Sequence, residues 1–297
     1  MNTDNISITG LLLHFRTPGK TLACLHSLRQ EGICKAIVVD NSEDGGKSVA
    51  TMQDGLDALQ GAGFDTVVLH PGHNLGFACG VAHGLEYLAN RQQLYHILLI
   101  NSDARLTTGS LDHMRHALKY ADIVAPKIAQ GNQSPSSPIA YYDQLLGLIT
   151  HTPKVRPLPH ASGCCLLIHQ CRAQPPLFDQ DFFFYGEDVM LGFDCQRDGV
   201  TVLECAKSVV AHATSSSAKN GSMFYEYHIN RSHWLLAQKL ACNPLERCLF
   251  LAARCITLPL RALVRSVRFR SFVAWKGLWA ATADVLRGRC RSFTPPS

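Results

Sequence analysis

Three polar residues follow an apolar run near the middle of the sequence. Asn101, Ser102 and Asp103 come directly after His96–Ile100, whose four aliphatic residues are typical of a buried strand. Ligands of open α/β sheets bind at the carboxyl ends of such strands, and Mg²⁺ and Mn²⁺ prefer oxygen ligands. The tripeptide therefore predicts a site for a divalent cation and a diphosphate. The alternative is an Asx turn that caps a helix predicted over residues 107–118.

A second polar cluster, Asp40-Asn41-Ser42, follows the apolar run Ala36–Val39. The carboxyl ends of parallel strands meet at one edge of a sheet, so a nucleotide would fit between the two clusters. The Asp40 carboxylate can accept hydrogen bonds from ribose hydroxyls or a base N–H. Asp103 can hold a cation that bridges two phosphates, with diphosphate and water as the remaining ligands.

The helix predicted between these strands, His73–Asn90, contains glycines at fourfold spacing: Gly76, Gly80 and Gly84. A bare stripe of this kind favours close packing of the helix on the sheet, and contact with a ligand is the alternative. Asn74 either caps the helix or touches the nucleotide. The candidate nucleotide-binding residues are Asp40, Asn41, Asn74, Gly76, Asn101 and Asp103.

The second half of the chain contains the residues best suited to proton transfer. Glu187 and Asp188 follow the aromatic run Phe182–Tyr185 and open a helix predicted to reach about Arg197. Carboxylates at that position stabilise the helix dipole, and a general base aimed into a pocket has the same location. His212 ends another apolar run, and its neutral imidazole would be a credible second ligand for a cation at Asp103.

The remaining pattern predicts the elements that position these residues. Strands are expected at Ile6–His14, Ala36–Val39, Thr66–Leu69 and Tyr95–Ile100, with a helix starting at Thr17-Pro18 after the first strand. Strands alternating with helices indicate an α/β fold with a mostly parallel sheet. The segment 130–159 is rich in Ser, Pro and Gly and is predicted to be a mobile loop or a small insertion.

Composition indicates a globular protein, because 46% of the residues are hydrophobic and 17% are charged. The twelve cysteines are scattered and often lie in apolar runs, and no charged-then-apolar segment opens the chain. These features predict a cytoplasmic protein with free thiols rather than a disulfide framework or structural zinc.

The positive charge is concentrated at the C-terminal end. Residues 244–297 contain ten Lys and Arg and two acidic residues, a net charge of +8, whereas residues 1–243 have a net charge of −3. Aromatic and aliphatic residues alternate with these arginines, which predicts amphipathic helices on an anionic membrane surface. Large aliphatic residues favour lipid over nucleic acid, and an ordinary helical subdomain with a solvated basic face is the alternative.

Five ordered motifs and a terminal histidine together resemble a family 2 glycosyltransferase, and among its members the rhamnosyltransferase-like enzymes of bacterial surface-polysaccharide synthesis. The resemblance covers roughly residues 6–240 and depends on these segments: Val38–Ser42, Asn74–Gly80, Leu99–Asp103, Ser162–Ile168, Phe184–Asp188 and His212. It implies a GT-A fold, a nucleotide-diphosphate sugar donor, Mg²⁺ or Mn²⁺, and inversion at the anomeric carbon. It also implies that Asp40 contacts the nucleoside, that Asp103 and His212 bind the metal, and that Asp188 is the catalytic base, with Glu187 as the second candidate.

The predicted organisation is a GT-A domain over residues 1–242 and a helical basic region over 243–297. The expected acceptor is a glycan or a lipid-linked glycan at the inner face of the cytoplasmic membrane, and an oligomer is compatible with the sequence. Phe15-Arg16 departs from the family's Tyr-Asn-like pair, so Arg16 meets either a phosphate or solvent. A sugar-phosphate nucleotidyltransferase and a non-catalytic membrane-associated scaffold are the alternatives, although Gly10–Lys20 is a poor match to a phosphate-binding loop.

Overall fold

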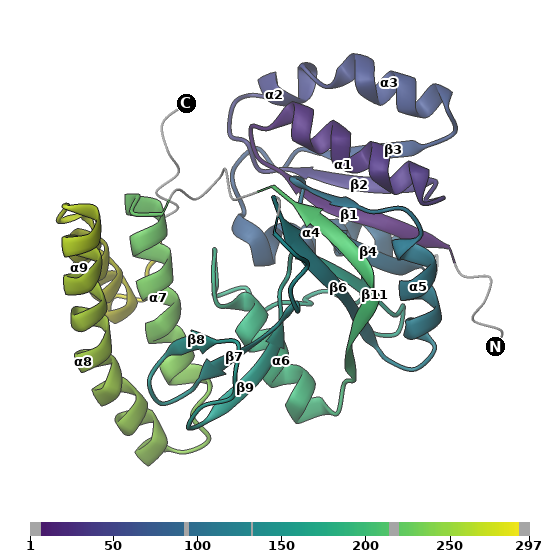
Figure 1. Ribbon diagram of the computed structural model, residues 1–297. Coiled ribbons are helices and arrows are strands. Elements are labelled where there is room, and N and C mark those ends of the chain that lie inside the picture. Colours follow the sequence, from purple (N-terminus) through teal and green to yellow (C-terminus); the bar gives the residue numbers. More distant parts are fainter. Residues whose placement is uncertain (1–6, 92–94, 132, 214–219, 291–297) are drawn as a thin grey trace. The chain divides into compact units, whose positions relative to one another are not determined.

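A computed structural model describes residues 7–91, 95–131, 133–213 and 220–290 (Figure 1). The chain divides into two units. Unit 1 comprises Met1–Ile139, Ala161–Phe178 and Asp194–Thr214, and unit 2 comprises Ala140–His160, Asp179–Phe193 and Ser215–Ser297.

Unit 1 contains an eight-stranded mixed sheet with the strand order β3-β2-β1-β4-β10-β6-β11-β5. β3, β2, β1 and β4 run parallel, β10 is antiparallel to both its neighbours, and β5 is antiparallel to β11. The first four strands confirm the predicted strands, although Ile6 lies outside the described residues. The bounds are β1 Ile8–His14, β2 Lys35–Asp40, β3 Asp65–Leu69, β4 His96–Ile100, β5 Ala104–Leu106, β6 Ile123–Gln130, β10 Cys165–Ile168 and β11 Val202–His212.

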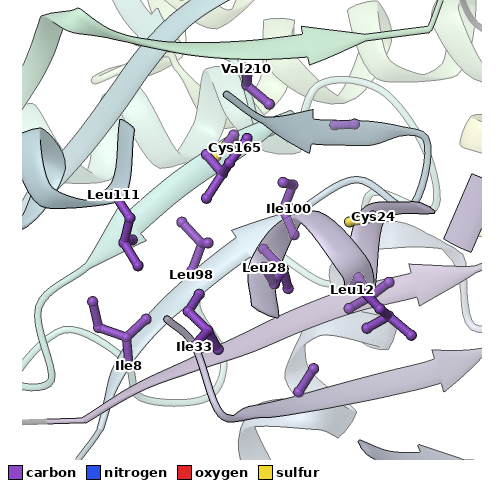
Figure 2. Close-up of a cluster of buried hydrophobic side chains, with 14 of the residues drawn as sticks. Ile8, Leu12, Cys24, Leu28, Ile33, Leu98, Ile100, Leu111, Cys165 and Val210 are labelled. Atoms are coloured by element: carbon purple, nitrogen blue, oxygen red, sulfur yellow. The ribbon is translucent and has the colours of Figure 1, made fainter. Parts of the chain in front are cut away.

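Both faces of β1, β2 and β4 are buried, which explains their continuous apolar sequences, whereas the edge strand β3 is only partly buried. On one face, Leu12, Leu98 and Ile100 belong to a cluster with Leu28 and Leu111 (Figure 2). The helices that contribute to this cluster are α1 (Pro18–Gln30), α2 (Lys47–Ala50), α3 (Gln53–Gly61) and α5 (Ser110–Leu118). α1 confirms the helix predicted after Thr17-Pro18.

The opposite face of the sheet is covered by α4 (Gly76–Ala89), whose glycines contact it directly. A Cβ atom at Gly84 would overlap the side chain of Leu11, and one at Gly80 would lie 3.1 Å from that of Leu13. The packing interpretation of the glycine stripe is therefore correct for these two positions, because only hydrogen allows the helix backbone this close to the sheet.

The segment predicted as a mobile loop or a small insertion is an insertion that contains strands. Unit 2 has a three-stranded sheet of order β8-β7-β9, formed by β7 (Ile139–Asp143), β8 (Leu148–Thr150) and β9 (Pro157–Ala161). These strands have only three to five residues and are separated by Ser, Pro and Gly, so no long apolar pattern marks them. The composition of the segment therefore did not predict the strands. β5 and β6 were also absent from the predicted elements.

Unit 2 is mainly helical. α7 (Met223–Lys239), α8 (Pro244–Phe269) and α9 (Val273–Leu286) pack along one another (Figure 1). α6 (Glu187–Asp198) begins in this unit, as predicted. A boundary after Cys242 stays a prediction, and in the structure α7 belongs to the same unit as α8 and α9. Within the described parts of the chain, none of the helices combines the length and apolar character needed to cross a bilayer.

Candidate functional site

Asp103 and His212 are brought together by strand pairing at the end of β4. β5 begins at the residue after Asp103 and pairs with the end of β11, so that Ala104 lies opposite His212. The Asp103 carbonyl accepts a hydrogen bond from the Ala213 N–H at 3.0 Å. As a result, Asp103 Oδ1 lies 3.1 Å from His212 Nε2, and the two side chains are only 13% and 17% exposed. The structure thus places the two predicted metal ligands side by side.

A hydrogen-bonded turn holds the tripeptide Asn101-Ser102-Asp103 in place. The Asn101 N–H donates to the Cys164 carbonyl at 2.8 Å, and the Asn101 carbonyl accepts from the Ala104 N–H at 2.9 Å. α5 begins only at Ser110, after β5, with Gly109 at its N-cap. The tripeptide therefore does not cap that helix, and the alternative interpretation of the motif is wrong.

The donor atoms at this turn fit a hard divalent cation. Asp103 offers a carboxylate oxygen and His212 a ring nitrogen, and these two atoms lie 3.1 Å apart. In the described ranges no group of three or more His, Cys, Asp or Glu could hold a metal. A cation here would have two protein ligands and would take the rest from phosphate oxygens and water, which suits Mg²⁺ and Mn²⁺. Burial raises the pKa of the nearby Cys164 thiol to about 12, so this sulfur stays protonated.

The side chains at the end of β2 bind other parts of unit 1. Asp40 is buried, and its carboxylate accepts from the Ser42 N–H at 3.0 Å and lies 3.4 Å from His70 Nδ1. The Asn41 amide group donates to the Gly76 carbonyl at 2.9 Å, and its oxygen accepts from the Leu75 N–H at 3.3 Å. Asn41 therefore joins the end of β2 to the start of α4.

Asn74 and Gly76 form the turn that precedes α4. The Asn74 side-chain oxygen accepts from the Gly76 N–H at 2.9 Å, and the Asn74 N–H donates to Glu43 Oε1 at 2.9 Å. Gly76 has φ 75°, a left-handed value that favours glycine. Both residues shape the turn, and their contact with a nucleotide stays a prediction.

Sequence reasoning missed a buried polar network at the end of β1. His14 is wholly buried, with Nδ1 2.7 Å from Thr21 Oγ1 and Nε2 3.0 Å from Ser48 Oγ. Burial lowers the pKa of His14, although the nearby carboxylates of Asp40 and Asp44 act in the opposite direction. The signal was present, since β1 and β2 both end in polar residues.

Arg16 extends this network instead of facing only solvent. Its N–H donates to Ser42 Oγ at 3.0 Å and its Nε to the Ser42 carbonyl at 2.7 Å. Ser42 Oγ also accepts from Ser48 Oγ at 3.1 Å. Arg16 has φ 52°, an uncommon value for a residue with a side chain, and these bonds hold the backbone there. A phosphate contact by Arg16 stays a prediction.

In unit 2, a tight turn positions Glu187 and Asp188 at the start of α6. Tyr185 and Gly186 both have positive φ, 67° and 94°. A Cβ atom at Gly186 would lie 2.7 Å from Phe182 Cε1 and 2.9 Å from Ser232 Cβ, so glycine is required on steric grounds as well. Backbone strain of this kind often occurs where a functional side chain must be aimed.

The two carboxyl groups that follow have different surroundings. Burial, with the negative charge of Asp188 as a second cause, raises the pKa of Glu187 to about 8. Among the described residues Glu187 Oε2 has no hydrogen-bond partner, although it is buried. Asp188 Oδ1 accepts from the Val189 N–H at 2.8 Å. Burial and the neighbouring carboxyl group therefore both favour the protonated form of Glu187.

The aromatic run before these carboxyl groups packs with α7. Phe183 stacks on His228 at 4.9 Å, while Phe184 and Tyr185 meet edge to face at 4.7 Å. Tyr185 also meets Tyr225 edge to face at 5.3 Å. The aromatic run thus belongs to a cluster of side chains from two segments of unit 2.

No family model matches the sequence, and no curated protein is similar to it in sequence. Solved structures are similar in fold. GalNAc-T7 with UDP, GalNAc and Mn²⁺ has a TM-score of 0.55 and 10% identity, and the match covers 99% of this chain and 59% of that one. The mannosyltransferase PcManGT from Pyrobaculum calidifontis, in complex with GDP-Man and Mn²⁺, has a TM-score of 0.52, 11% identity, and coverage of 97% and 89%.

Residues 1–349 of S. aureus TarS match with a TM-score of 0.51, 12% identity, and coverage of 96% of this chain and 92% of that one. Because the identities are low, these matches show the fold alone. The chain spans about three fifths of the length of GalNAc-T7. The predicted fold is confirmed: the protein has a GT-A fold, with helices at its C-terminal end.

Proposed function

We propose that this protein is an inverting glycosyltransferase that moves rhamnose or a similar sugar from a nucleotide-diphosphate donor to a hydroxyl group. The observation that supports this most strongly is the Asp103–His212 pair, two metal-ligand side chains at 3.1 Å, placed at the end of β4 in a GT-A sheet. In sheets of this type the ligand site lies at the carboxyl ends of the strands.

The donor site is assigned to residues of unit 1. Asp103 and His212 would hold Mg²⁺ or Mn²⁺, which neutralises charge on the diphosphate leaving group. Asp40 would accept a hydrogen bond from the nucleoside, while Asn41, Asn74, Gly76 and Asn101 shape the surrounding turns. The complexes of GalNAc-T7 with UDP and Mn²⁺ and of PcManGT with GDP-Man and Mn²⁺ support this donor class, since they share the fold.

Asp188 is the proposed catalytic base. It would take the proton of the acceptor hydroxyl while that oxygen bonds to C1 of the sugar and the bond from C1 to the diphosphate oxygen breaks, with inversion at C1. Glu187 is the second candidate, but burial raises the pKa of its carboxyl group and so favours the form that has already bound a proton, which makes it the less suitable base.

The acceptor is proposed to be a glycan or a lipid-linked glycan of bacterial surface-polysaccharide synthesis. The aromatic cluster of Phe183, Phe184 and Tyr185 supports a sugar acceptor, because sugar rings offer apolar faces to aromatic side chains. A lipid-linked acceptor would place the protein at the inner face of the cytoplasmic membrane.

Donor hydrolysis tests the proposal. The protein is incubated with a panel of nucleotide sugars and Mn²⁺ or Mg²⁺, and nucleoside diphosphate release is measured. We expect slow release from one donor, lost on chelation and in Asp103→Ala. Release that survives both treatments would contradict the metal assignment. Formation of pyrophosphate from a sugar phosphate and a nucleoside triphosphate would instead identify a nucleotidyltransferase.

A further inference from the structure

One face of α8 is apolar and exposed along the length of the helix. Its large apolar residues share one side of the helix, and each is at least half exposed: Leu249, Ile256, Leu260, Leu263, Val264 and Val267. Small exposed residues, Ala252 among them, complete this outer face of α8. A continuous apolar surface on a helix of 26 residues, about 39 Å long, marks an interaction site.

The rotation of α8 is fixed by the other side of the helix. Phe250 and Arg254 are wholly buried, and the Arg254 guanidinium donates to the carbonyls of Leu145 and Gln144 at 2.5 and 2.8 Å. Arg265 Nε lies 2.6 Å from a carboxylate oxygen of the buried Glu226. Rotating α8 to bury its apolar face would break these buried bonds. The packing of unit 2 therefore keeps this face exposed.

The exposed charge on this pair of helices is positive. Exposed basic residues lie at the ends of α8 and along α9: Arg247, Arg268, Arg270, Lys276, Arg287 and Arg289. In the described part of residues 244–297, both acidic residues are engaged, since Glu246 pairs with Arg156 and Asp284 is buried and accepts from the Tyr227 hydroxyl. A surface of this sign attracts anionic partners and opposes symmetric contact with a second copy.

The aromatic residues beside α9 suit a lipid interface. Phe272 is 76% exposed and Trp279 is 66% exposed. Tryptophan favours the boundary between headgroups and acyl chains, and a helix too polar to span the bilayer binds by lying in that boundary.

We propose that the outer face of α8, together with Phe272 and Trp279, binds the surface of an anionic membrane. The apolar face enters the headgroup region, and the exposed arginines and Lys276 contact acidic lipid headgroups. This inference is independent of sugar transfer, because it depends only on exposure, charge and the fixed rotation of α8.

Vesicle co-sedimentation of the full chain tests it. Vesicles of phosphatidylcholine with about one third phosphatidylglycerol are compared with pure phosphatidylcholine. The variant Ile256→Glu/Leu260→Glu/Val264→Glu should reduce binding to the anionic vesicles by about 10-fold or more, because it places negative charges on the face that would enter the membrane. Its matched control is Tyr120→Glu/Val155→Glu, two exposed apolar residues outside α8 and α9, which should bind as the parent does.

A second variant separates charge from apolar burial. Arg268→Gln/Arg270→Gln/Lys276→Gln should weaken binding to anionic vesicles and reduce its dependence on salt. All substituted side chains are exposed, so thermal unfolding should confirm an intact fold. Equal binding to both vesicle types, or retained binding by the Glu variant, would overturn the proposal. A dimer that the same Glu substitutions dissociate would assign the face to a second copy instead.

Discussion

The ends of β2 and β4 contain the same three residue types, yet they make different contacts. Asp40, Asn41 and Ser42 bind other parts of unit 1, with Asn41 bonded at both ends of its amide to the start of α4. At the end of β4, by contrast, Asp103 faces His212, and each presents a metal-ligand atom to the other.

Asn41 thus uses its side chain to bond within the protein, whereas Asp103 and His212 place two possible metal ligands next to each other. Buried polar groups that bond within the protein stabilise the fold, and removing one leaves its partner unsatisfied. The two ligand atoms of Asp103 and His212, which backbone pairing holds close together, would act mainly by binding a cation. Asn41 should therefore respond to substitution in stability, and Asp103 and His212 in binding.

Removal of the proposed base should affect turnover more than binding or stability. We expect Asp188→Asn to lower turnover by about 10²-fold or more, with donor affinity nearly unchanged, because only proton transfer is removed. Glu187→Gln is the control and should retain most turnover at pH 7. Steady-state kinetics with the donor found in the hydrolysis panel measures both. A variant Asp188→Asn with normal turnover would move the base elsewhere.

His212→Ala tests the binding role of the β4 end. The Mn²⁺-dependent affinity for nucleoside diphosphate should fall by about 10-fold or more, since one of two protein ligands is lost. His70→Ala is the matched control, because His70 contacts Asp40 at the β2 end and is not a proposed ligand. Equal losses in the two variants would break the distinction between the two strand ends.

The structural role of the β2 end is tested by Asn41→Ala. Unfolding free energy should fall by about 2 kcal/mol, because the Leu75 N–H and the Gly76 carbonyl lose their partners. Denaturant titration measures the change. Asp103→Ala should cost less, about 1 kcal/mol in the same assay, since it removes a single side-chain hydrogen bond, the one with His212. A reversed order would contradict our interpretation of both ends.

Glu187→Gln is expected to change how the free energy of unfolding depends on pH. The folded-state pKa of Glu187 is about 8, above its ordinary value of 4.5, so the folded protein holds a proton that the unfolded chain releases between these values. Stability from this group is therefore full below pH 4.5 and is lost as pH rises toward 8. Relative to the parent, the variant should therefore become more stable as the pH rises from 4.5 toward 8. A constant difference would show that Glu187 ionises normally.

Sequence patterns predicted the parts of the fold that depend on local runs. β1 to β4, α4 and the start of α6 each contain a continuous apolar or amphipathic pattern. The contact between Asp103 and His212 depends on β5, a strand of three residues that pairs with β11 about a hundred positions later. Pairing at that distance leaves no local signal, so the sequence could offer the two residues as ligands but not their geometry.

The role of Asn41 was hidden for a similar reason. From the sequence it was one of three polar residues after a strand, equivalent to Asn101. Its two bonds depend on how α4 packs on the sheet, where a Cβ atom at Gly80 would lie only 3.2 Å from the Asn41 amide nitrogen. Tertiary packing, not residue type, separates the two clusters.

The most direct test of the central claim is calorimetric titration of UDP, GDP and dTDP into the parent and into Asp103→Ala, with and without Mn²⁺. We predict that the parent binds at least one of them only when Mn²⁺ is present, and that Asp103→Ala loses this binding while its thermal unfolding stays close to that of the parent. Binding by Asp103→Ala with the parent's affinity and metal dependence would contradict the assignment of the β4 end as the metal and diphosphate site.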